Sequence, residues 1–292
     1  YWFAAGCQIL ETLYEVLKAQ VRSSNYLMGD ETPIPVLDNR KKNATHQGYF
    51  WVYYSPLDKL VCFDYREGRA RDGPAEFLKG FQGYLQTDGY QAYDQFDKDP
   101  NMRLLGCMAH ARRKFEHALT NDRKRAEYAM DQFQELYKLE RRAKEEGMSA
   151  EERKALREKE ALPILEKMQA WLQENQHQVL PRSAIGKAIN YSSGLWNRLM
   201  RYTEEGRFEI DNNLVENSIR PVALGRKNYL FAGSHKGASR AAIIYSFLGT
   251  CKQNGVDPFR WLRDVFTRLP DQPVNRLEEL LPQNWQDTYE QE

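Results

Sequence analysis

The segment around Glu216 holds residue types that can bind a metal ion next to a nucleic-acid backbone. From Ile210 to Pro221, the helical repeat of about 100° per residue predicts one polar face, formed by Asn213, Glu216, Asn217 and Arg220. Val215 and Ile219 would lie on the opposite, apolar face. Asp and Asn side chains favour a helix start, whereas a proline cannot continue the hydrogen-bond ladder, so Pro221 is expected to end the helix. The polar face is either a solvated surface or one part of a metal site.

A long tract without acids follows this carboxylate. Between Asn217 and Val256 there is no Asp or Glu, and the basic residues of the tract are Arg220, Arg226, Lys227, Lys236, Arg240 and Lys252. The net charge of the whole chain is only +1, so a nucleic-acid partner would have to be bound by a local patch such as this one. An acid that borders a basic tract indicates a metal ligand beside a surface that receives phosphates. We expect Arg226, Lys227 and Lys236 to contact DNA backbone.

Two other acids lie within or after apolar, strand-like segments. Asp30 is inside the first such segment, where an ionised carboxylate is costly unless it is paired or binds a metal. Its neighbour Glu31 must face the other way, because side chains alternate along a strand. Asp88 ends a later strand and precedes Gly89, which would allow a backbone or a phosphate to approach closely. Taken singly, Asp88 is explained as a turn former and Asp30 as a satisfied buried acid.

Together, Asp30, Asp88 and Glu216 would form a different kind of site. Two carboxylates from neighbouring strands and one from a helix can hold two divalent ions about 3.5–4 Å apart, an arrangement used for in-line phosphoryl displacement. Ligands that are all oxygen favour Mg²⁺ or Mn²⁺ over zinc. Asp211 is the main alternative for the third ligand, although a role in capping the helix would explain it without chemistry.

Further polar residues lie near the predicted strand end at residue 107. His110 forms a C-x-x-H pair with Cys107, which is too little for a zinc site, and we expect it at a buried edge or facing DNA. Arg112 and Arg113 open a helix, where they form either a solvated face or contacts to phosphates. The sequence shows no P-loop and no dinucleotide fingerprint, so nothing in it indicates nucleotide hydrolysis.

The composition is that of a folded protein of one large or two smaller domains. The chain has 292 residues, of which 41% are hydrophobic and 28% charged, which argues against disorder. The four cysteines have no paired spacing, so they indicate a reducing cytoplasm rather than a disulfide framework. No apolar run approaches the roughly 20 residues that span a membrane. The chain begins with Tyr-Trp-Phe rather than Met, and we expect it to be a piece of a longer protein.

The order of the predicted elements favours an α/β (α+β) fold. We expect an N-terminal helix (1–25), then a strand-rich first part of the core (26–120), with three antiparallel strands, a helix, a strand, and a strand followed by a helix. Prolines 33 and 35 predict that the first strand leaves the depth of the sheet beyond Thr32. Residues 121–204 are dense in Glu, Lys and Arg at helical spacing, which predicts a helical insertion with solvated charged faces. The last part of the core (205–235) carries Glu216, and a C-terminal helical region (236–292) ends in a loosely packed tail.

Several short motifs occur in one order along the chain. They include Gly-Asp-Glu-Thr-Pro at 29–33 and Thr-Asp-Gly-Tyr at 87–90, and the others lie at 106–115, 210–217, 224–234 and 254–258. Together they closely resemble the catalytic and C-terminal domains of the insertion-sequence-sixty-six family of bacterial DDE transposases, from about residue 4 to residue 270. Because several unrelated motifs occur in the same order, the resemblance is specific.

The resemblance implies a ribonuclease H-like mixed sheet flanked by helices, with a helical insertion before the last catalytic acid. It implies that Asp30, Asp88 and Glu216 are the acidic triad that holds two Mg²⁺ (or Mn²⁺) ions. It also implies double-stranded DNA as the partner (transposon ends and target), a homo-oligomer on DNA, accessory proteins of the same element, and a bacterial cytoplasmic location at the nucleoid. The family often has arginine directly after the glutamate, and here that residue is Asn217, which puts one phosphate contact in doubt.

The function predicted on these grounds is that of a DNA transposase. It would cleave DNA at transposon ends in a metal-dependent reaction and transfer the strand into target DNA, with His110, Arg112, Arg113, Arg220, Arg226, Lys227 and Lys236 as DNA-binding residues. The alternatives are a ribonuclease H-like nuclease without strand transfer and a non-catalytic DNA-binding remnant of a transposase. An unrelated helical domain with incidental acids is the remaining reading.

Overall fold

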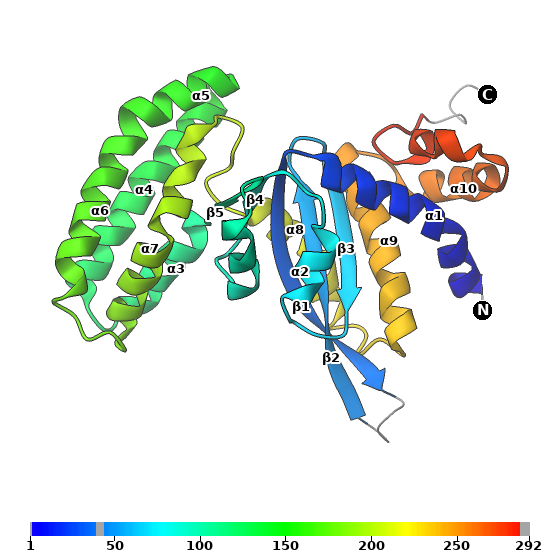
Figure 1. Cartoon of the computed structure of the whole chain (residues 1–292), viewed down its shortest axis with the longest axis horizontal. Coiled ribbons are helices and arrows are strands. Elements are labelled where there is room, and N and C mark those ends of the chain that lie inside the picture. Colours follow the sequence, from blue (N-terminus) through cyan, green and yellow to red (C-terminus); the bar gives the residue numbers. More distant parts are fainter. Residues whose placement is uncertain (1, 39–43, 287–292) are drawn as a thin grey trace. The chain divides into compact units, whose positions relative to one another are not determined.

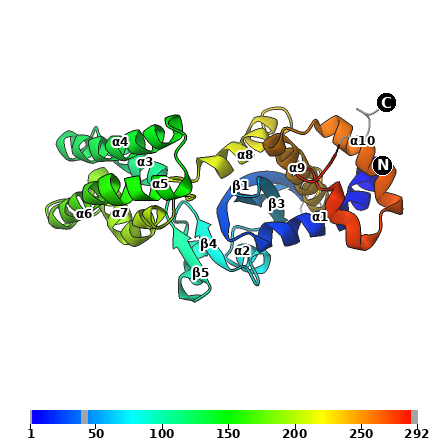
Figure 2. The ribbon, with the colours of Figure 1, turned by 90° about the horizontal axis from the view of Figure 1, so that it is seen from above.

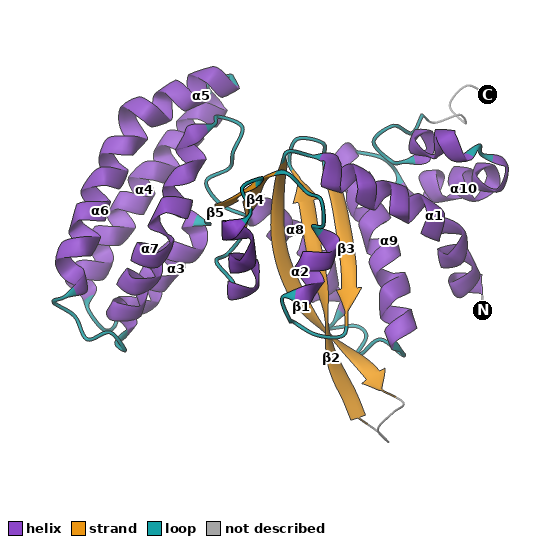
Figure 3. Ribbon diagram, in the orientation of Figure 1, coloured by secondary structure: helices purple, strands orange, loops and turns teal. Residues whose placement is uncertain are grey.

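The computed structural model describes residues 2–38 and 44–286. They divide into two compact units (Figure 3). We call the first the sheet unit; it comprises Tyr1–Leu85, Gln91–Met102 and Leu214–Glu292. We call the second the helical unit; it comprises Gln86–Tyr90 and Arg103–Asn213.

Five strands form one mixed sheet, in the order β3-β2-β1-β4-β5 (Figure 1). The strands are β1 (Tyr26–Asp38), β2 (Ala44–Ser55), β3 (Leu60–Arg66), β4 (Gly83–Gln86) and β5 (Met102–Leu105). The pairs β1–β2 and β2–β3 are antiparallel. These observations confirm the α/β class and the three antiparallel strands at the start of the chain. They follow from long runs of aromatic and β-branched residues, which fit a pleated surface that is buried on both sides.

β1 continues as a strand through its two prolines. It pairs with β2 as far as Asp38, beyond both Pro33 and Pro35. On its other edge, Val36 forms an isolated parallel bridge with Ala232. A proline offers no N–H for a sheet ladder, but its carbonyl can still accept, and that of Pro35 accepts the N–H of Ala232 at 2.8 Å.

Helices cover both faces of the sheet (Figure 2). α1 (Trp2–Ser23) and α2 (Asp72–Phe77) lie on one face, where Tyr53 stacks on Phe77 with ring centroids 3.9 Å apart. The 3₁₀ helix η1 (Gln91–Lys98) is on the same side, since Tyr93 packs edge-on against Trp51. α8 (Asn213–Gly225) and α9 (His235–Asn254) lie on the other face, where Phe50 and Phe63 contact Tyr245.

The end of the chain packs against the sheet unit. α9 ends at Gly255, whose φ of 68° is the left-handed conformation that glycine tolerates, as its position in the sequence predicts. α10 (Pro258–Arg268) and the 3₁₀ helices η4 (Leu269–Asp271) and η5 (Val274–Leu280) follow. Leu280 is fully buried, and its carbonyl accepts a hydrogen bond from the indole of Trp261 at 2.9 Å. The expectation of a loosely packed tail was therefore wrong for the described part of this segment.

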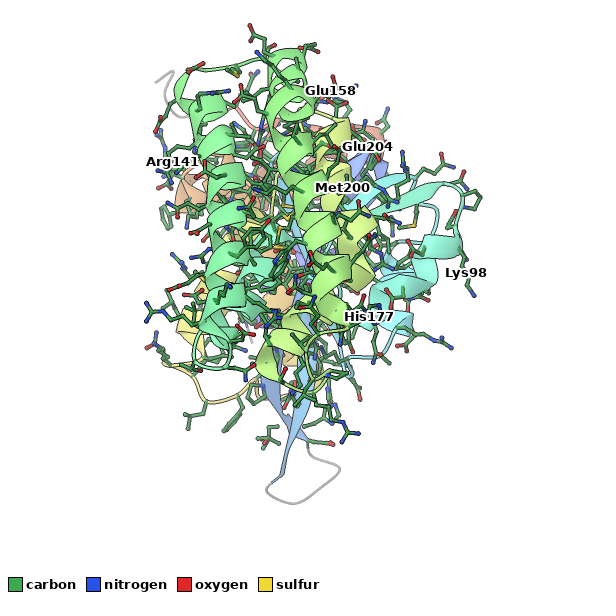
Figure 4. The ribbon with its side chains drawn as sticks, turned by 90° about the vertical axis from the view of Figure 1, so that its left-hand side faces the viewer. Lys98, Arg141, Glu158, His177, Met200 and Glu204 are labelled. Carbon is green, nitrogen blue, oxygen red and sulfur yellow. The ribbon has the colours of Figure 1, made fainter. Side chains whose placement is uncertain are left out.

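The helical unit consists mainly of long antiparallel helices. They are α3 (Met108–Ala118), α4 (Arg123–Glu145), α5 (Ala150–Leu156), the π-helical turn η2 (Arg157–Ala161), α6 (Leu162–Gln176), α7 (Ala184–Met200) and the 3₁₀ helix η3 (Arg201–Glu204). Ser149 and Glu152 form a capping box at the start of α5. Figure 4 shows charged side chains such as Arg141 and Glu158 along the outside of these helices.

One charged cluster lies inside the helical unit, contrary to the expectation of solvated faces. The side chain of Arg157 has no exposed surface. Its guanidinium donates to Glu140 at 2.8 Å and to the carbonyl oxygens of Tyr202, Glu205 and Phe208, also at 2.8 Å. The guanidinium also lies over the ring of Tyr202. This one side chain therefore joins α4 to the segment that leads toward α8.

α8 does not end at Pro221, so that part of the prediction was wrong. The helix runs on to Gly225 with the proline in its interior. A proline at this position removes the hydrogen bond to the carbonyl of Asn217. Both residues are exposed, so water can satisfy that carbonyl and the helix tolerates the loss.

Candidate catalytic site

Asp30 lies in β1, on the side of the sheet that α8 and α9 cover. It is paired with Val52 in β2, which is paired with Phe63 in β3. Directly opposed residues of antiparallel strands point to the same face, and the ring of Phe63 lies 5.6 Å from that of Tyr245 in α9. The Asp30 side chain is half-buried, and its Oδ1 accepts the N–H of Glu31 at 2.8 Å.

Glu31 faces the opposite side, as the alternation of a strand requires. It is paired across the sheet with Trp51, which is paired with Asp64. Arg69 donates to Glu31 at 2.7 Å, and Arg66 donates to Asp64, also at 2.7 Å. Burial raises the pKa of Asp64, and the charge of Arg66 acts against this rise. Both acids on this face thus have arginine partners, which accounts for their burial without a metal.

Glu216 lies in the first turn of α8, at the border between its buried and exposed faces. Val215 and Ile219 are 0% and 9% exposed, which confirms the predicted apolar face. Asn217 and Arg220 are exposed, whereas Glu216 is half-buried and its Oε1 is shielded from solvent. Glu216 therefore presents its carboxylate from a partly dehydrated position at the start of α8.

Asp88 follows β4 and belongs to the helical unit. Its Oδ1 accepts the N–H of Tyr90 at 2.8 Å, and its carbonyl accepts a hydrogen bond from the hydroxyl of Tyr191 in α7. Gly89 has a φ of 85°, and a Cβ there would lie 2.4 Å from Leu195. The glycine after Asp88 is thus explained by the close packing of α7. A phosphate is not needed to account for it.

Gln86 connects three segments of the helical unit that sequence reasoning had not linked. Its side chain is fully buried, and Nε2 donates to the carbonyl oxygens of Gly106 and Glu209, each at 3.0 Å. The N–H of Met108 also donates to the carbonyl of Ile210 at 3.1 Å. The segment that carries Asp88, the start of α3 and the chain that enters α8 are therefore fastened together. A single glutamine gives no pattern in the sequence that would reveal such long-range bonds.

Asp211 has a structural explanation. It is 7% exposed; Oδ1 accepts the N–H of Asn213, the first residue of α8, at 3.0 Å, and Oδ2 accepts the hydroxyl of Tyr137 in α4 at 2.7 Å. Burial raises the pKa of Asp211, and the hydrogen bond from Tyr137 acts to lower it. Burial and the nearby Asp211 raise the pKa of Tyr137. The pair fixes the start of α8, a role close to the predicted cap.

The residues predicted around the start of α3 lie together in the helical unit. His110 is half-buried, and its Nε2 lies 3.5 Å from Nη1 of Arg113. Arg112 donates to Glu116 one turn further along at 3.3 Å. Cys107 is fully buried, and its sulfur accepts the N–H of Asn212 at 3.4 Å. Arg113 is the most exposed cation of this group.

The basic residues that follow Glu216 differ in how they are used. A guanidinium nitrogen of Arg226 donates to the carbonyl of Pro33 in β1, so this arginine helps to hold the segment after α8. Arg220, Lys227 and Lys236 are exposed. All four belong to the sheet unit. The exposure of Arg220, Lys227 and Lys236 is compatible with the predicted phosphate contacts, which stay a prediction.

The three predicted ligands are divided between the two units. Asp30 and Glu216 belong to the sheet unit, whereas Asp88 belongs to the helical unit. Across residues 2–38 and 44–286, no group of three or more His, Cys, Asp or Glu side chains is arranged to hold a metal ion. The assembly of all three carboxylates around metal ions therefore stays a prediction.

Two family models match the chain in succession. The model of the transposase IS66 family matches residues 1–240, and that of the IS66 C-terminal element matches residues 246–283. Together they cover the helical unit and most of the sheet unit, including Asp30, Asp88 and Glu216. Within the described residues, no helix is long and apolar enough to cross a membrane.

Curated relatives extend the similarity over nearly the whole chain. The uncharacterized proteins y4hP and y4jD of Sinorhizobium fredii are each 34% identical to it, over 300 and 294 aligned residues that cover 94% of the chain. A third protein of that organism, the uncharacterized protein y4qI, is 32% identical. The alignments cover 53% to 57% of the relatives, so the chain spans little more than half of their length. No solved structure matches the chain.

Proposed function

The chain belongs to the transposase IS66 family, and from this premise we propose that it is the catalytic part of a DNA transposase. It would nick DNA at transposon ends and join the freed ends to target DNA. The observation that carries the proposal is the family match over residues 1–240, which includes all three candidate acids in their motifs. The chain spans little more than half of its relatives' length. We therefore also propose, for the whole protein, that it binds specific end sequences, forms an oligomer on DNA and acts with accessory proteins.

The sheet supports the further proposal that the fold is ribonuclease H-like. Its strand order is β3-β2-β1-β4-β5, with the first three strands antiparallel. Asp30 lies on the central strand β1, and Asp88 follows the adjacent strand β4. Along the chain, the helices α3 to α7 come between Asp88 and α8, which carries Glu216. The acids of this chain thus occupy element positions that the proposed fold would use.

The candidate ligands suit Mg²⁺ or Mn²⁺. Asp30, Asp88 and Glu216 offer only carboxylate oxygens, which such hard cations prefer. Asp30 and Glu216 are half-buried, and a carboxylate partly removed from water is stabilised by an adjacent cation. Bound ions would activate a water molecule and stabilise the leaving oxygen of an in-line displacement. We propose that these three residues hold two such ions.

The proposed reaction has two steps, a nick and a joining step. In the nick, a water oxygen forms a bond to phosphorus while the bond from phosphorus to the 3′ oxygen breaks, which leaves a 3′-hydroxyl and a 5′-phosphate. In the joining step, that hydroxyl oxygen forms a bond to the phosphorus of a target phosphodiester while the bond from this phosphorus to the target 3′ oxygen breaks, which leaves a 3′-hydroxyl on the target strand. One phosphodiester replaces another, so no nucleotide cofactor is needed. His110, Arg112 and Arg113 on the helical unit, and Arg220, Arg226, Lys227 and Lys236 on the sheet unit, would orient the DNA backbone.

Amide substitutions test the proposal, because they keep the shape of each acid and remove its charge. In Asp30→Asn, Asp88→Asn and Glu216→Gln, we expect Mg²⁺-dependent nicking to fall by at least about a hundredfold while DNA binding is retained. Joining of precut ends should be lost in parallel. Glu31→Gln is the matched control, since Glu31 is adjacent to Asp30 but faces the other side of the sheet.

Each outcome separates the proposed function from its alternatives. A wild-type protein that nicks but never joins precut ends would be a nuclease of the same fold. A protein that binds DNA without either reaction would be a non-catalytic remnant. Nicking at the wild-type rate by any of the three amide variants would remove that residue from the catalytic group.

A further inference from the structure

Two apolar side chains project from the basic tract after α8, and the proposed function gives them no role. Leu230 is 78% exposed and Phe231 is 41% exposed. Exposed apolar surface that is contiguous can mark a site where a protein meets a partner. The chain around them is rich in cations and, from Asn217 to Val256, free of acids. We call the pair Leu230–Phe231 the apolar tip.

The residue before the apolar tip is firmly anchored. The N–H of Tyr229 donates to the carbonyl of Gly225 at the end of α8 at 2.9 Å, and its hydroxyl bonds to that of Tyr245 in α9, also at 2.9 Å. Its ring packs so closely on Gly225 that a Cβ there would lie 2.6 Å from the ring. Tyr229 is therefore fixed between the two helices α8 and α9.

The residue after the tip is anchored as well. Ala232 donates its N–H to the carbonyl of Pro35 at 2.8 Å and accepts the N–H of Leu37 at 2.8 Å, which fastens it to the edge of β1. Only two residues lie between the anchors at 229 and 232. Leu230 and Phe231 are thus exposed on a two-residue segment that is fixed at both ends.

The charges of the tract that contains the tip suit a polyanionic partner. Arg220, Lys227 and Lys236 are exposed and belong to the same unit as the tip. An acid from outside the tract, Glu67, approaches it through His235, with Nδ1 to Oε1 at 3.8 Å. Cations along a surface neutralise phosphates, and apolar side chains among them can enter the stack of bases. Aromatic rings also stack on unpaired bases whatever the sequence.

We propose that Leu230 and Phe231 form a wedge that inserts between stacked bases of bound DNA. The inference rests on the proposed function, since it names how the same protein would deform its DNA. The cations supply affinity for the backbone, and the apolar tip unstacks a base step next to it. The rigid anchors at Tyr229 and Ala232 hold the tip in place, so that the deformation is not relieved by movement of the segment.

The wedge is tested with a fluorescent adenine analogue whose emission is quenched by stacking. A set of blunt and nicked duplexes carries the analogue at successive positions, and emission is measured at saturating protein without divalent metal. The full chain should raise emission severalfold at one position or a few adjacent ones. Leu230→Ala with Phe231→Ala should lose this rise while it weakens binding by less than about tenfold, because the cations remain.

Two variants make the test specific. Leu180→Ala is the matched control, because Leu180 is also 78% exposed but lies in the helical unit; it should behave as the wild type. Lys227→Ala should weaken binding and reduce its salt dependence while the emission at saturation stays unchanged. Leu230→Ala alone should give a partial loss, and since this side chain is exposed the variant should fold normally.

The outcomes keep this inference separate from the proposed function. DNA binding without any rise in emission, or an equal rise with the doubly substituted protein, would overturn the wedge. Binding to vesicles that contain phosphatidylserine, lost in the double variant while DNA distortion is unchanged, would also overturn it and assign the tip to a membrane surface. A protein that distorts DNA through the tip but never nicks it would support the wedge and contradict the transposase.

Discussion

Glu140 and Glu216 are both glutamates on helices, yet the molecule uses them in different ways. Glu140 lies inside the helical unit, with its side chain 9% exposed between Arg153 and Arg157. Its two oxygens accept three hydrogen bonds from these arginines, each at 2.8 Å. Glu216 is half-buried in the first turn of α8, in the sheet unit.

The two glutamates differ in how far their carboxylates are removed from water. The oxygens of Glu140 are occupied by fixed donors, so a metal could bind only by breaking an ion pair. Glu31 and Asp64 are held in the same way by Arg69 and Arg66. Glu216 and Asp30 are only half-buried, so these two carboxylates keep some contact with water. Burial together with an arginine partner therefore marks an acid as structural.

Arg157→Leu removes one of the two arginine partners of Glu140 and should have the largest effect on the free energy of unfolding. It removes the cation and leaves Glu140 buried without it, which typically costs about 3–5 kcal/mol. The carbonyl oxygens of Tyr202 and Phe208 would lose their donor as well. Chemical denaturation followed by circular dichroism would measure the change in the free energy of unfolding.

Glu216→Gln is the natural comparison for that measurement. Because we assign Glu216 to chemistry, its amide variant should unfold within about 0.5 kcal/mol of the wild type and lose only nicking. If Arg157→Leu unfolds like the wild type, the buried ion pairs are not what stabilises the helical unit. A large loss of stability in Glu216→Gln would mean that Glu216 stabilises the fold.

A fall in pH should also lower the free energy of unfolding, by a smaller amount, because it acts on the same ion pairs of Glu140. Burial acts to raise the pKa of Glu140, but the hydrogen bonds and charges of Arg157 and Arg153 outweigh it and hold the pKa below its ordinary value. Such a carboxyl adds stability above its unfolded pKa of about 4.3, and this contribution is lost as the pH falls through the folded pKa. The free energy of unfolding should therefore decrease as the pH is lowered below about 5.

Substitution of Glu140 isolates its contribution to the pH dependence of the free energy of unfolding. Glu140→Gln should show a flatter dependence of unfolding on pH than the wild type in a denaturation series at successive pH values. Glu160→Gln is the control, because it removes a pair with Arg142 that is much more exposed than that of Glu140 and should change the dependence far less. Parallel pH curves for the wild type and Glu140→Gln would assign the acid sensitivity to other groups.

The sequence predicted those features that depend on local pattern. The aromatic run at 49–54 predicted β2, and the local sequence predicted that Asp30 lies in a strand and Glu216 in a helix. Such predictions succeed because strand and helix patterns are local properties. Pro221 was misjudged because a proline on an exposed helix face costs one hydrogen bond that water replaces. Arg157 looked like one charge among many, since its partner Glu140 lies on another helix. Gln86 and Tyr137 were missed for the same reason, as each acts through a bond to a residue far along the chain.

Replacement of each candidate acid by cysteine tests most directly whether Asp30, Asp88 and Glu216 bind metal. A thiolate is a poor ligand for the hard ion Mg²⁺ and a better one for softer ions such as Mn²⁺. We predict that Asp30→Cys, Asp88→Cys and Glu216→Cys lose nicking in Mg²⁺ and regain part of it in Mn²⁺, while Glu31→Cys nicks in both. Equal nicking in Mg²⁺ by the wild type and any one of the three variants would contradict the proposed metal site.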